Sequence, residues 1–79
     1  MRKREEKLVV TFKNTTEAMH MESCCKKQGV PGRVIPVPTQ ISAGCGLAWS
    51  CKKEDAQIVQ EYIEMNKIKY EQMQFCMLI

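Results

Sequence analysis

The sequence predicts a single α+β domain whose elements follow in the order β-α-β-β-α-β. Two patterns predict this class: four short runs of β-branched or alternating apolar residues, and two helical segments that follow the first and the third of those runs. A chain of 79 residues can bury only one thin hydrophobic core. We therefore expect one domain over residues 1–79, in which residues 1–6 form a flexible basic N-terminus.

The first strand and the first helix have recognisable boundaries. Residues 7–13 (KLVVTFK) are rich in β-branched residues and predict a strand, with one face made of Leu8, Val10 and Phe12. A helix is expected from about Thr15 to Gln28. Asn14 can cap its start, and Glu17 can reach back in a capping box. Gly29 supplies the stop. The core-facing stripe of this helix is Ala18, Met21 and Cys25.

The second half of the chain adds two strands and a helix after an edge strand. Residues 32–38 (GRVIPVP) predict a strand at a sheet edge, because Pro36 cannot donate to a ladder. Residues 47–51 predict the third strand. Residues 52–68 predict the second helix, with a stripe of Val59, Tyr62, Ile63 and Asn66 and with Ile58 beside it. Residues 69–79 alternate and predict a final strand, with Met73, Phe75, Met77 and Ile79 on one side.

This order of elements is that of the ferredoxin-like plait. Two helices then cover one face of a four-stranded antiparallel sheet, with the first and third strands central and the other two at the edges. The opposite face of the sheet is expected to be open. A partner protein, or a second copy in a homodimer, is expected to cover it.

Charge and cysteine content exclude several classes of protein. The net charge of +3 comes largely from the N-terminus and lacks the basic stripe with interleaved aromatics of a nucleic-acid binder. No apolar run is long enough to cross a bilayer. Five cysteines are an odd number without regular spacing, which argues against a disulfide framework and for a reducing cytoplasm. Without a C-x2-C pair, no metal site or other cofactor is predicted.

The stretch ISAGCGLAWSC, residues 41–51, contains the most informative thiol. Cys45 lies between Gly44 and Gly46 and follows Ser42 and Ala43, so little side-chain cover surrounds its sulfur. Glycines also allow backbone N–H groups to converge into an anion-binding nest, which would favour a thiolate. These features indicate an exposed carrier or acceptor thiol. The alternative is a tight turn that contains a small hydrophobic residue.

The other cysteines have weaker signals. Cys51 is either a resolving thiol for Cys45 or a half-buried strand residue. Cys24 lies four residues after His20 on one helix face, and this spacing can bring the imidazole near the sulfur. Two ligands do not close a zinc site, and a coincidence on the helix surface explains the pair as well. Cys25 is expected in the core. Cys76 is expected on the side of its strand opposite Met73.

Two blocks of sequence resemble a known family. TFKNTTEAMHME (residues 11–22) and GVPGRVIPVPTQISAGCGLAW (residues 29–49) are similar to the selenium/sulfur carrier-like family of small bacterial domains. The second block is the specific one, since it joins a proline-punctuated strand to a cysteine within GCG. The resemblance implies that sulfur or selenium is carried on the cysteine that matches Cys45.

The expected function is therefore that of a carrier more than of a turnover enzyme. A cysteine desulfurase or a selenium-delivery protein would load Cys45 as a persulfide or selenopersulfide, and an acceptor enzyme would receive it. Ser42 would donate a hydrogen bond, and Lys52 and Lys53 would aid docking or lower the thiol pKa. The alternative is a non-catalytic binding or regulatory module in which Trp49, on an open sheet face, anchors a partner.

Overall fold

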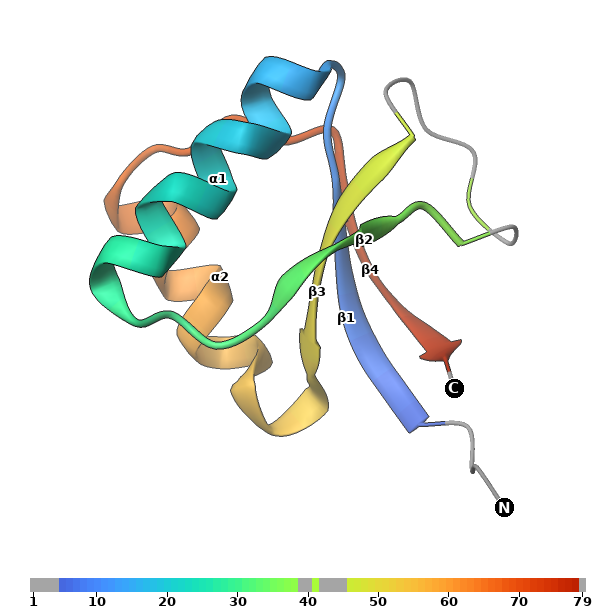
Figure 1. Cartoon of the computed structure of the whole chain (residues 1–79). Coiled ribbons are helices and arrows are strands. Elements are labelled where there is room, and N and C mark those ends of the chain that lie inside the picture. Colours follow the sequence, from blue (N-terminus) through green and yellow to red (C-terminus); the bar gives the residue numbers. More distant parts are fainter. Residues whose placement is uncertain (1–4, 39–40, 42–45, 79) are drawn as a thin grey trace.

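The computed structural model describes residues 5–38, 41 and 46–78, and it has the predicted order of elements (Figure 1). The sheet order is β2-β3-β1-β4 with every neighbouring pair antiparallel, and the two helices cover one face. The ferredoxin-like plait is therefore confirmed, with Pro36 on an edge strand as expected. The elements are β1 (Glu5–Thr11), α1 (Thr15–Gln28), β2 (Arg33–Pro36), β3 (Leu47–Lys52), a 3-10 turn η1 (Lys53–Asp55), α2 (Ala56–Met65) and β4 (Gln72–Leu78).

The predicted bounds of α1 are confirmed at both ends. The Oδ1 atom of Asn14 accepts the backbone N–H of Glu17 at 2.9 Å. The Glu17 carboxylate accepts the backbone N–H of Lys13 at 3.2 Å, one residue before the cap, so the reciprocal bond of the predicted capping box is shifted by one position. Gly29 ends the helix in the left-handed conformation, with φ 68°.

The second helix is shorter than the sequence predicts, and its stripe differs. Its buried side is Ala56, Val59 and Ile63, while Tyr62 is half-buried and Ile58 is exposed. The prediction that Asn66 lies on the core side of the helix is wrong, because this residue caps the C-terminal end of the helix. Its Nδ2 donates to the carbonyl of Tyr62 at 2.9 Å. Ile68, just beyond the helix, is the buried residue. The start is also later, because Lys52 is still extended and η1 intervenes.

Trp49 lies on the face of the sheet that the helices cover. The alternation of β3 sends Trp49 and Cys51 toward the main core, and sends Ala48 and Ser50 to the opposite face. Trp49 is 3% exposed, and its Nε1 donates to the carbonyl of Pro31 at 3.3 Å. The expectation of an exposed Trp49 as a docking anchor is therefore wrong.

The face of the sheet away from the helices is partly covered by the chain itself. Ile41, from the β2–β3 connection, is 8% exposed and packs in a second small cluster with Val9 and Ala48, both fully buried. Ile35, Val37 and Cys76 pack around this cluster. The prediction of an open face is therefore wrong in part, because Ile41 covers some of this face.

β1 is longer than predicted at its N-terminal end. It begins at Glu5, which pairs with Leu78 of β4, and Glu6 pairs with Met77. Two of the six residues expected to form a flexible terminus thus lie in a strand, and residues 1–4 lie outside the described residues. The pairing makes β1 and β4 the longest strands of the sheet, with seven residues each.

Substitution of Gly32 by Ala tests the contact that fixes the start of β2. A Cβ at Gly32 would lie 2.5 Å from Trp49 Nε1 and 2.6 Å from the carbonyl oxygen of Ser50, at φ +120°. We expect Gly32→Ala to lower the free energy of unfolding by about 3 kcal/mol, through backbone strain and overpacking together. The control Gly29→Ala, where nothing lies within 4 Å of the added Cβ, should cost only about 1 kcal/mol. Equal losses in urea unfolding would contradict this assignment.

Candidate functional site

The β2–β3 connection carries the predicted site, and its described residues fasten it to the sheet. The N–H of Val37 donates to the carbonyl of Gly46 at 3.0 Å, which closes the mouth of the connection. Within it, the N–H of Ile41 donates to the carbonyl of Pro38 at 2.9 Å, and the Ile41 side chain is buried. The predicted site residues Cys45, Ser42, Ala43 and Gly44 lie outside the described residues.

Gly46 is the one glycine of the GCG motif that the structure describes. Its φ of 77° is in the left-handed region, where residues with a side chain are strained. Apart from its chain neighbours, no atom of the described residues lies within 4 Å of the position that a Cβ would take. Gly46 is therefore needed for its backbone conformation, and the access that it was expected to give to Cys45 stays a prediction.

Cys51 is enclosed on the helix-covered side of the sheet. It is 3% exposed, and burial, with a smaller contribution from Asp55, raises the pKa of its thiol to about 11. Ile41 fastens the β2–β3 connection to the opposite face. The Cys51 thiol is therefore enclosed in the main core. Its role as a resolving thiol for Cys45, which lies outside the described residues, stays a prediction.

Cys25 is also buried. It belongs to the main core as predicted, and burial, together with the neighbouring Cys24 and Cys51, raises the pKa of its thiol to about 11. At neutral pH both buried thiols are thus protonated, and a protonated thiol is a poor nucleophile. Two of the five cysteines are thereby assigned to packing.

Cys24 and His20 are in contact on the outer face of α1. The Sγ atom of Cys24 lies 3.4 Å from Nε2 of His20, which confirms the proximity that the spacing predicted. The hydroxyl of Tyr62 donates to the Cys24 carbonyl at 3.2 Å, so α2 holds this turn of α1 in place. Among the described residues, no group of three His, Cys, Asp or Glu side chains could hold a metal ion. Among the described residues, the pair thus lacks the further ligands that a closed metal site needs.

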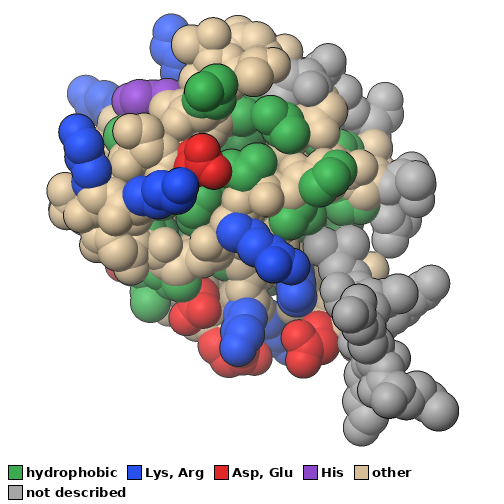
Figure 2. Space-filling view, in the orientation of Figure 1, with side chains coloured by type: hydrophobic (Ala, Val, Ile, Leu, Met, Phe, Trp, Pro, Cys, Tyr) green, Lys and Arg blue, Asp and Glu red, His purple; other side chains and the backbone are tan. Residues whose placement is uncertain are grey.

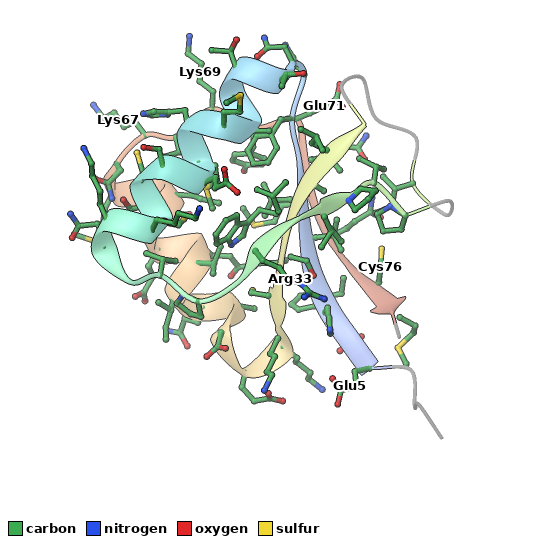
Figure 3. The ribbon with its side chains drawn as sticks, in the orientation of Figure 1. Glu5, Arg33, Lys67, Lys69, Glu71 and Cys76 are labelled. Carbon is green, nitrogen blue, oxygen red and sulfur yellow. The ribbon has the colours of Figure 1, made fainter. Side chains whose placement is uncertain are left out.

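Cys76 lies on the face of β4 away from the helices, as predicted (Figure 3). It is half-buried at the edge of the cluster formed by Val9, Ala48 and Ile41, and burial raises the pKa of its thiol. Met73 packs against the main core on the other side. Cys76 and Ile41 thus share one face of the sheet.

A cluster of cations on this same face was missed by reading the sequence. Lys7 of β1 lies directly opposite Lys52 of β3, and Arg33 of β2 lies opposite Ser50. Lys52 and Lys53 were both predicted to assist Cys45, and this stays a prediction. Lys53 forms an exposed ion pair with Glu6 at 3.6 Å. Only the strand register brings the three cations together, so no local pattern could have found them.

Comparison with known families matches residues 7–74 to the family described as "Putative Se/S carrier protein-like". The chain belongs to this family. The matched region spans β1 through most of β4 and includes the GCG motif with Cys45. No curated protein and no solved structure gives a significant match. The resemblance inferred from residues 11–22 and 29–49 is thus confirmed.

No described helix of this family member is long and apolar enough to span a membrane.

The thiols of the carrier-like domain should differ sharply in reactivity. With N-ethylmaleimide at neutral pH we expect Cys24 to react faster than Cys76, because burial raises the pKa of the Cys76 thiol. Cys25 and Cys51 should stay unmodified until the protein unfolds. Peptide mass mapping over time measures this order. Labelling of Cys51 as fast as Cys24 would contradict the assignment.

The same two buried thiols give stability a pH dependence. Their pKa rises from 9.0 in the unfolded reference to about 11 in the fold, so the unfolded chain loses its protons first as pH rises. The contribution of these two thiols to the free energy of unfolding is therefore fully present below pH 9 and is lost between pH 9 and pH 11. Urea unfolding across this window should show the loss, and Cys25→Ala should make the slope shallower.

Proposed function

We propose that the protein carries sulfur or selenium on Cys45. Membership of the selenium/sulfur carrier-like family, over a match that includes this residue, is the observation that carries the proposal. The packing roles of Cys25 and Cys51 support it, because they narrow the thiols available for chemistry to Cys45, Cys24 and Cys76. The left-handed Gly46 and the open space beside it further support an accessible sulfur at the preceding position.

Loading is a thiol exchange that balances without an outside oxidant. The Cys45 thiolate attacks the outer sulfur of a persulfide on a donor such as a cysteine desulfurase. A new S–S bond forms on Cys45 as the donor's S–S bond breaks, and the donor cysteine leaves as its thiolate. A selenopersulfide forms in the same way from a donor that presents selenium. An acceptor thiolate then attacks the outer atom and releases Cys45.

The alternative of a partner-binding module loses its anchor. Its proposed contact residue, Trp49, is buried under the helices and its indole N–H is already bonded. Donor and acceptor identities, a homodimer and a cytoplasmic location stay predictions. The carrier proposal is thus the one that the described residues favour.

Loading by a cysteine desulfurase tests the proposal. The reduced protein is incubated with the enzyme and cysteine, its intact mass is measured, and the adduct is mapped to peptides. We expect a gain of one sulfur atom, reversible by a reducing thiol, on Cys45 and in far lower amount elsewhere. Cys45→Ser should abolish the gain.

Two matched controls separate Cys45 from the other accessible thiols. Cys24→Ser removes the sulfur beside His20, and Cys76→Ser removes the thiol on the shared sheet face. Both variants should load as the unchanged protein does. A gain that survives Cys45→Ser but is lost in Cys24→Ser would move the carrier site to α1 and refute the proposal.

A further inference from the structure

A pocket of about 330 Å³ lies at the end of β3, between the start of β2 and η1. Its lining contains more positive than negative charge, because it includes three cations, Lys7, Arg33 and Lys52, and one carboxylate, Asp55. Gly32, Ser50 and Cys51 complete the wall. Figure 2 shows several Lys and Arg side chains gathered below a hydrophobic area, in the region where Figure 3 labels Arg33.

The three cations are placed together by the sheet. Lys7 and Lys52 are direct cross-strand partners, and Ser50 has Val9 on one side and Arg33 on the other. Because side chains alternate along a strand, Lys7, Arg33, Ser50 and Lys52 all lie on the face that Val9 shares, away from the helices. Like charges placed directly opposite in a sheet repel and destabilise it. The arrangement therefore has a cost that an anion between the cations would relieve.

Among the described residues, no ion pair neutralises these cations. All nine Asp and Glu residues are among the described residues, and none lies in an ion pair with Lys7, Arg33 or Lys52. The nearest acids besides Asp55 are Glu5, Glu6 and Glu54, which line an adjoining pocket with Lys52 and Lys53. One of them, Glu6, is already paired with Lys53. Three cations and one carboxylate leave this pocket with a charge of 3 − 1 = +2.

We propose that this pocket binds a small phosphate-type oxyanion. A dianion matches the pocket's net charge of two, whereas a single carboxylate would leave one cation uncompensated. Arg33 offers a planar fork of donors suited to two oxygens of a phosphate, and lysines act as mobile point charges on the others. The Ser50 hydroxyl, on the floor at 6% exposure, is a further donor. The anion is either free phosphate or the phosphoryl group of a small metabolite.

This proposal rests on the lining of the pocket and not on Cys45, so its failure and the failure of sulfur loading are distinguishable. Cys45→Ser should leave anion binding unchanged. Arg33→Gln should leave loading by the desulfurase unchanged. Both residues that we would replace, Arg33 and Lys52, are exposed, so their Gln variants should fold.

The test is a titration of the ¹⁵N-labelled protein with inorganic phosphate at neutral pH and constant ionic strength, balanced with chloride. We expect saturable shifts at the amides of Gly32, Arg33, Ser50 and Lys52 in the millimolar range. Arg33→Gln and Lys52→Gln should each weaken binding about tenfold, since a hydrogen bond to a charged group is worth about 1.5–3 kcal/mol. The control Lys27→Gln, in the last turn of α1, should bind as the unchanged protein does.

A second arm identifies the source of the anion. Glycerol phosphate that binds more tightly than inorganic phosphate assigns the pocket to a phosphorylated metabolite, and equal or weaker binding assigns it to free phosphate. Shifts that chloride alone reproduces, shifts centred on other residues, or unchanged affinity in both Gln variants would overturn the site. Circular dichroism of each variant confirms that the comparison is between folded proteins.

Discussion

Burial of β1 on both faces is the constraint that organises this domain. Leu8 and Val10 are covered by the helices, and Val9 is equally buried although no helix lies on its side. Full burial of an aliphatic side chain is worth about 1.5–3 kcal/mol, a large part of the stability of so small a domain. Ile41 supplies this cover from the β2–β3 connection. The β2–β3 connection is therefore tied to the sheet at Ile41, four residues before Cys45.

The same two-sided arrangement sorts the cysteines by role. The helix-covered side holds Cys25 and Cys51, whose burial keeps them protonated at neutral pH. The opposite side holds the Ile41 anchor, the half-buried Cys76 and the cationic pocket. A chain with five thiols can use one of them selectively only if the rest are protected or poorly placed. Family membership and this sorting together favour Cys45 as the working thiol.

Much of the fold was predictable because its signals are local. The caps of α1 at Asn14 and Gly29, and the edge position of Pro36, follow from single residues and their immediate neighbours. The errors concern features that depend on distant parts of the chain. Which face Trp49 takes is set by where the helices pack, and the cover over Val9 comes from Ile41, more than thirty residues away in sequence. The cationic pocket likewise exists only through the pairing of Lys7 with Lys52. Cys45 itself stays a prediction from its glycine neighbours and its family.

The central claim is that Cys45 is the thiol that carries sulfur or selenium. The most direct measurement is the rate of Cys45 alkylation by iodoacetamide as a function of pH, in a variant with Cys24→Ser and Cys76→Ser. A carrier needs a reactive thiolate at neutral pH, so the proposal predicts a titration midpoint below the value of about 8.5 for an ordinary cysteine. A midpoint at or above that value, or alkylation of Cys45 slower than that of Cys24 in the unchanged protein, would contradict the account.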